Sequence, residues 1–138
     1  MADRDPREIQ RRRMAWQIAL ILSLVTGFWH ILSLRMLFLV VGLAQLTGGA
    51  RMILDLRRGT RGWGSRVALV AACIGSTYHL LILALASFEL LAGTPQDAPL
   101  LFQTVVWGVV DLLIVFALAW GSPDGQARAR PVRQPGLV

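Results

Sequence analysis

The stretch that decides the fold runs from residue 14 to residue 50 and reads MAWQIALILSLVTGFWHILSLRMLFLVVGLAQLTGGA. Only His30 and Arg35 within it could carry a charge. A single helix of this length would measure about 55 Å, whereas a bilayer core is about 30 Å thick and takes roughly 20 apolar residues. The stretch is therefore too long for one membrane span, and it predicts two spans joined by a tight turn at 33–35.

Two further apolar runs follow, at 67–91 and 99–120, and the charged residues are confined to islands between the runs. This pattern predicts an all-α integral membrane protein, a bundle of four transmembrane helices. We expect spans at 14–33, 36–54, 67–91 and 99–120. A basic tail (1–13) precedes them, and a basic tail rich in Gly and Pro (121–138) follows and should be disordered.

The arginines predict the orientation of the bundle. All 14 basic residues are Arg, and twelve of them lie before the first span, between the second and third, or after the fourth. Positive charge accumulates on the cytoplasmic side of membrane proteins, so both termini should be cytoplasmic. An even number of spans must then separate the first two islands, which supports dividing the long run in two.

The same charges bear on location and partners. A composition with arginine and no lysine is typical of a GC-rich bacterial genome, so we expect a multi-pass protein of a bacterial plasma membrane. Basic flanks favour anionic lipid headgroups. Because orientation accounts for the basic residues, we expect no nucleic-acid partner.

Each expected span carries a stripe of small and polar residues at helical spacing. Such stripes let membrane helices approach closely and bond across the interface. The stripes are Ala19, Ser23, Thr26, Gly27, His30 and Ser33 in the first span; Gly42, Gln45, Gly48, Gly49 and Met52 in the second; Ala68, Ala72, Gly75, His79 and Ala86 in the third, with Glu89 at the edge; and Thr104, Trp107, Gly108, Asp111 and Val115 in the fourth.

Ionisable residues inside a membrane usually face the bundle interior and find partners. Asp111 and His79 lie about 18 Å and 20 Å from the outer ends of their runs, so we expect them to be close together. His30 and Glu89 both lie roughly 4–6 Å from the outer edge and could form a second, shallower pair. Arg51 and Asp55 are four residues apart near the inner end of the second span and should pair with each other.

Three interpretations of the buried histidines and carboxylates remain open. His79 and Asp111 could satisfy each other and fix the packing of the helices. They could instead relay protons, because imidazole titrates near neutrality. A third interpretation has His30 and His79 ligating a haem, since aromatic-His-aliphatic-Leu occurs twice, at 29–32 and 78–81. The expected depths of the two histidines differ by roughly 15 Å, which disfavours it.

No sequence motif for catalysis, nucleotide binding or metal binding is present, and the lone Cys73 excludes an internal disulfide. We therefore expect a non-enzymatic accessory or structural subunit of a membrane assembly, with a protein partner or copies of itself and with no cofactor or metal. The alternatives are an oligomeric proton-coupled transporter or channel using Asp111 and His79, and then a haem- or quinone-binding module.

Overall fold

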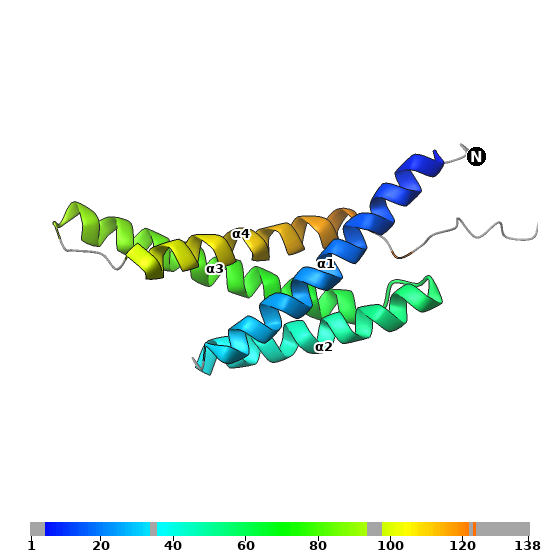
Figure 1. Cartoon of the computed structure of the whole chain (residues 1–138), viewed down its shortest axis with the longest axis horizontal. Helices are drawn as coiled ribbons and strands as arrows, with labels where there is room; N and C mark the ends of the chain where they lie inside the picture. Colours follow the sequence, from blue (N-terminus) through cyan, green and yellow to red (C-terminus); the bar gives the residue numbers. More distant parts are fainter. Residues whose placement is uncertain (1–4, 34–35, 94–97, 122, 124–138) are drawn as a thin grey trace, which may run out of the picture.

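The computed structural model describes residues 5–33, 36–93, 98–121 and 123. Four helices make up this part of the chain: α1 (Pro6–Leu32), α2 (Met36–Arg58), α3 (Trp63–Leu91) and α4 (Ala98–Trp120), shown in Figure 1. Each is long and apolar enough to cross a membrane. The prediction of an all-helical chain with four potential membrane spans is confirmed.

The first helix begins well before the expected start of the span at residue 14. The carboxylate of Asp5 accepts a hydrogen bond from the Arg7 backbone N–H at 2.9 Å, and Pro6 occupies the first helical position, which suits its fixed φ. Arg12 pairs with Glu8 one turn earlier, at 2.6 Å. Residues 6–13, expected as part of a basic tail, therefore extend the helix of the first span.

The turns and the tail are described in part. α1 ends at Leu32 and α2 begins at Met36, on either side of the expected turn, and Leu34 and Arg35 lie outside the described residues. Nearly all of the tail expected at 121–138 also lies outside them.

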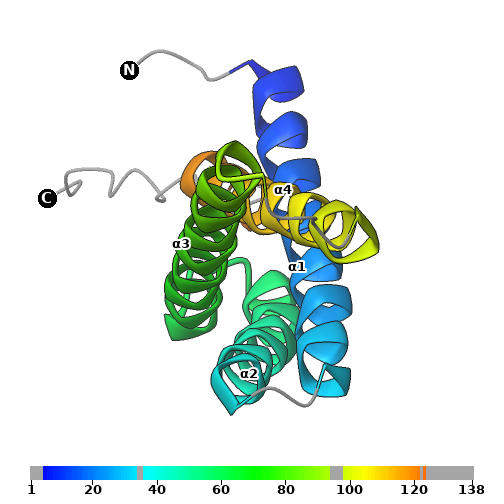
Figure 2. The same ribbon diagram turned by 90° about the vertical axis from the view of Figure 1, so that its left-hand side faces the viewer.

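The four helices form a ring in which each packs against its two neighbours in the order α1, α2, α3, α4 (Figure 2). Most residues of the predicted stripes are buried and face the centre, whereas Ala86 is half-buried and Glu89 is exposed near the end of α3. At the α1–α2 contact, a Cβ added to Gly42 would lie 2.7 Å from the Gly27 carbonyl oxygen. At the α2–α3 contact, a Cβ on Gly48 would lie 2.8 Å from the Gly64 carbonyl oxygen. These glycines let the backbones approach closely, as in other membrane bundles.

The two hairpins are staggered along the bundle. Figure 1 shows the α3–α4 hairpin projecting well beyond the end of the α1–α2 hairpin, while α1 crosses the other helices obliquely. In the projecting part, residues 87–93 of α3 and its C-terminal turn and residues 98–100 of α4 are exposed. The stagger determines which residues share a level in the bundle, and it matters for the site below.

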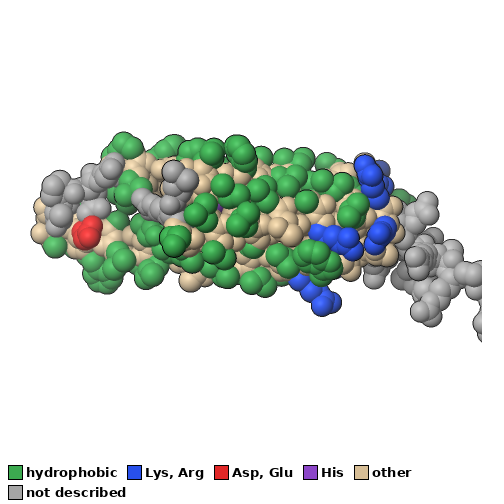
Figure 3. All heavy atoms as spheres, turned by 90° about the horizontal axis from the view of Figure 1, so that it is seen from below, with side chains coloured by type: hydrophobic (Ala, Val, Ile, Leu, Met, Phe, Trp, Pro, Cys, Tyr) green, Lys and Arg blue, Asp and Glu red, His purple; other side chains and the backbone are tan. Residues whose placement is uncertain are grey.

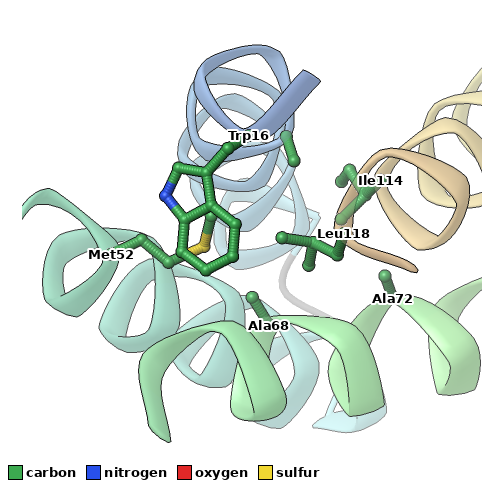
Figure 4. Close-up of a cluster of buried hydrophobic side chains, with 7 residues drawn as sticks. Trp16, Met52, Ala68, Ala72, Ile114 and Leu118 are labelled. Carbon is green, nitrogen blue, oxygen red and sulfur yellow. The ribbon is translucent and has the colours of Figure 1, made fainter. Parts of the chain in front are cut away.

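At the opposite end, the interior is apolar. Seven buried side chains from all four helices meet there: Trp16, Ala19, Met52, Ala68, Ala72, Ile114 and Leu118. Figure 4 draws them and labels all but Ala19. Each is fully shielded from solvent. This apolar core fills the bundle between its arginine-bearing end and the polar residues described next.

The loop between α2 and α3 is held by Asp55, which is buried. Its carboxylate accepts a hydrogen bond from the backbone N–H of Gly62, the residue that caps α3, at 3.1 Å. The predicted partner Arg51 places its Nε 4.0 Å from the same carboxylate and its guanidinium over the ring of Trp63. Asp55 thus joins the end of one helix to the start of the next.

Candidate functional site

Four polar side chains, one from each helix, meet inside the bundle: His30 (α1), Gln45 (α2), His79 (α3) and Asp111 (α4). We call them the polar centre. Their exposed fractions are 1%, 0%, 4% and 0%. Burying polar groups is costly unless they are paired, so the contacts among these four decide what the site can do.

Gln45 links the two sides of the polar centre. Its Nε2 donates to Asp111 Oδ1 at 2.8 Å, and its Oε1 lies 3.0 Å from His30 Nδ1. The backbone carbonyl of Gln45 also accepts a hydrogen bond from Ser23 at 3.1 Å. Contacts to α1 and α4 thus hold the carboxamide from both sides.

Glycines make the space for this cluster. Asp111 fits only because residue 75 lacks a side chain, since a Cβ there would overlap the Asp111 carboxylate. Gly108 plays the same part for His79, whose Cβ would lie 3.1 Å from an added Cβ. The small-residue stripes therefore do more than bring the helices together, because they leave room for a polar interior.

The structure brings together the predicted pair of His79 and Asp111. His79 Nδ1 lies 3.4 Å from Asp111 Oδ2, but without the geometry of a hydrogen bond. The structure places His30 and Glu89, the predicted outer pair, in different parts of the bundle. Among the described residues, His30 packs in the polar centre, whereas Glu89 is exposed on the projecting part of α3.

The expected depths of the histidines were wrong because they assumed that all outer helix ends lie in one plane. The α3–α4 hairpin projects beyond the α1–α2 hairpin (Figure 1), and the ring of His79 contacts that of His30 although His79 is farther from its own helix end. The two imidazoles are stacked, with centroids 5.8 Å apart. Their closeness removes the difference in depth that disfavoured a bis-histidine haem site.

A cavity of about 200 Å³ adjoins the polar centre on the side away from the apolar core. Aromatic rings form much of its wall: Trp29 stacks on Trp107 at 5.1 Å, and Phe38 stacks on His30 at 4.8 Å. The first stack explains why a tryptophan occurs in the middle of the fourth span. His30 and His79 line the cavity, as do polar residues nearer the ends of α1 and α4: Ser33, Gln103 and Thr104.

Three buried atoms of the polar centre lack a hydrogen-bond partner within the described part of the chain. They are His30 Nε2, His79 Nδ1 and Asp111 Oδ2. One ligand atom from each of these three residues lies within 4.8 Å of the others. The arrangement can bind a cation or exchange protons between imidazole and carboxylate.

Gln45 is the member of the polar centre that the sequence did not predict as a site residue. It lies on the predicted stripe of α2 together with Gly42, Gly48 and Gly49, which should pack and bond across the interface, but the sequence pattern does not mark it as a site residue. A carboxamide flanked by glycines on an inward face is a signal of a polar partner, because such a group is costly to bury alone. The cavity-lining Trp29 and Phe38 carried no comparable signal.

Comparison with protein-family models, with curated proteins and with solved structures finds no match for this chain.

Proposed function

We propose that this chain is a non-enzymatic integral subunit of a bacterial plasma membrane, and that it binds a small polar or charged ligand at the polar centre. The cavity of about 200 Å³ that ends on His30 and His79 carries this proposal. Ionisable groups inside a membrane mark functional sites by default. Concave sites with aromatic walls and a few convergent polar groups are typical of small-ligand binding.

Both termini are cytoplasmic in this proposal, so the ligand enters from the outside. Figure 3 shows Arg side chains gathered at one end of the long apolar surface and an acidic side chain at the other. The excess of Arg at the N-terminal flank and in the α2–α3 loop supports a cytoplasmic location for that end. The cavity lies on the far side of the polar centre from the apolar core, toward the outer end.

Conduction through the bundle is the second candidate, and the packing disfavours it. Between the polar centre and the inner end lies the apolar core, with Trp16, Ile114 and Leu118 fully buried (Figure 4). The closed apolar core therefore favours binding of a ligand from one side of the membrane over proton-coupled transport.

Access to the cavity tests the proposal. In a Cys73→Ala background, a cysteine at Thr104, which lines the cavity, should react with a membrane-impermeant thiol reagent added outside intact cells. A cysteine at Ala72, in the apolar core, is the matched control and should react at least about tenfold more slowly, because only accessible thiols react. Equal protection of both cysteines, or labelling of Thr104→Cys from the cytoplasmic side alone, would contradict the proposal.

A protein partner is the second part of the proposal. The projecting part of the α3–α4 hairpin exposes large apolar side chains that α1 and α2 do not cover: Phe88, Leu90 and Leu91. Isolation of the tagged protein from its native membrane in mild detergent, followed by mass spectrometry, should reveal a stoichiometric companion. Recovery of the chain alone, or only with copies of itself, would refute the role of an accessory subunit.

A further inference from the structure

We infer that the polar centre is a binding site for one divalent transition-metal ion, ligated by His30, His79 and Asp111. The inference rests on the proposed function and names the class of its ligand. It departs from the expectation, drawn from the sequence, that the chain holds no metal. Three features support it: the spacing of the ligand atoms, the hydrogen bonds of Gln45, and the buried atoms without partners.

The ligand atoms are close to the spacing that a metal ion requires. Nitrogen and oxygen ligands bind Zn²⁺ at about 2.0–2.2 Å, so neighbouring ligand atoms around a tetrahedral ion are about 3.3–3.5 Å apart. His79 Nδ1 and Asp111 Oδ2 are already 3.4 Å apart. One ligand atom of each of the three residues lies within 4.8 Å of the others, so all three residues are within reach of a single ion.

The hydrogen bonds of Gln45 determine which nitrogen of His30 carries the proton. The nitrogen of the Gln45 carboxamide faces Asp111 and donates to Oδ1 at 2.8 Å. The carboxamide oxygen then faces His30 Nδ1 at 3.0 Å and requires that Nδ1–H donate to it. The Nε2 atom of a neutral His30 therefore holds a free lone pair, as a metal ligand must.

This arrangement matches the way proteins support metal-binding histidines. Such histidines usually donate their other ring N–H to an oxygen acceptor, which fixes the tautomer and the direction of the ring. Ligating carboxylates are likewise held by hydrogen bonds. Gln45 supports a histidine and a carboxylate at once and is therefore a positioning residue for two ligands.

A cation would also satisfy the three unpartnered atoms. His30 Nε2, His79 Nδ1 and Asp111 Oδ2 are buried without a hydrogen-bond partner among the described residues. A direct bond between His79 and Asp111 would still leave His30 Nε2 without one. A cation between the three would accept all three lone pairs, and the carboxylate would offset part of its charge.

The ligand types select the class of ion. Two imidazoles and one carboxylate suit Zn²⁺, Fe²⁺, Co²⁺ or Ni²⁺, whereas Mg²⁺ and Ca²⁺ prefer all-oxygen sites and Cu⁺ prefers sulfur. Three protein ligands leave a coordination position open, as in zinc sites that bind water or substrate. The adjoining cavity provides the space for a water molecule or a solute at that position.

The test uses the full chain, purified in detergent with a tag that contains no histidine and stripped of metal with a chelator. Titration with Co²⁺ should yield visible d–d absorption bands that saturate at one ion per chain, and Zn²⁺ should abolish them. Each of His30→Gln, His79→Gln and Asp111→Asn should weaken binding by more than tenfold. Gln45→Met should weaken it about 10- to 100-fold.

Ser76→Ala is the matched control, because Ser76 is buried on the same helix as His79 but donates only to carbonyls of its own helix. This variant should bind Co²⁺ like the wild type. If a ligand variant fails to fold, two measurements on the wild-type protein still test metal binding. It should bind one Co²⁺ per chain, and Zn²⁺ should raise its melting temperature.

Two results would overturn the inference: no saturable Co²⁺ spectrum from the wild type, or equal binding by the wild type and the three ligand variants. Either result combined with external labelling of Thr104→Cys would leave the binding-site proposal standing with a different ligand. Loss of that labelling would instead remove the proposed function.

Discussion

Replacing Gly42 by leucine is expected to force α1 away from α2 and to lower the free energy of unfolding by about 3 kcal/mol, at the upper end of typical overpacking effects. An added Cβ would lie 2.7 Å from the Gly27 carbonyl oxygen and 3.0 Å from the Cβ of His30. The first contact is with backbone, which cannot rotate away as a side chain can. Separation of the helices would also displace His30 from Gln45.

The measurement is the free energy of unfolding in detergent, from a denaturation series followed by circular dichroism. Ala50→Leu is the control, because Ala50 is exposed on the same helix. The variant introduces a leucine there that does not face another helix. It should change the free energy of unfolding by less than about 0.5 kcal/mol. Equal stability of the two variants would show that the close α1–α2 approach is unimportant.

Replacing Gly75 by leucine should both destabilise the bundle and disable the polar centre. A side chain at this position would overlap the Asp111 carboxylate, so α3 and α4 must separate or Asp111 must leave Gln45 and His79. We expect a loss of about 2–3 kcal/mol in the free energy of unfolding. Co²⁺ affinity should fall by more than tenfold, because a carboxylate ligand is displaced.

Thr77→Leu provides the control for this variant. Thr77 is exposed on the same helix and bonds only to a carbonyl of that helix, at 2.8 Å. Its variant should keep both the stability and the metal affinity of the wild type. If Gly75→Leu retained normal Co²⁺ binding in a folded protein, Asp111 could not be the ligand that the geometry indicates.

Both substitutions test one property of this bundle: close contact between helix backbones and a polar interior depend on the same stripes. Gly27 and Gly42 bring α1 against α2, next to His30. Gly75 and Gly108 leave room for Asp111 and His79. The lack of side chains at these positions therefore serves packing and the site together, and a single added side chain should affect both.

The pattern of residues along the chain is enough to predict the helices and the faces they bury. Long apolar runs interrupted by arginine islands require spans of bilayer length, because backbone groups in lipid must be paired within a helix. The periodicity of small residues indicated the inward faces, and His79 and Asp111 could be matched because α3 and α4 are joined by a short connection that keeps their outer ends together. Each of these features depends on a single helix or on two helices that are adjacent in the sequence.

The relative heights of the two hairpins, in contrast, are set by the packing of all four helices. The stagger visible in Figure 1 brings His30 beside His79 and leaves Glu89 exposed, whereas equal helix ends would separate the histidines by roughly 15 Å. Nothing in a single helix specifies its axial position against a helix distant in sequence. That position follows from how the glycine contacts, the apolar core and the polar side chains of four helices fit together, so the three-residue ligand set with Gln45 behind it became visible only in the folded bundle.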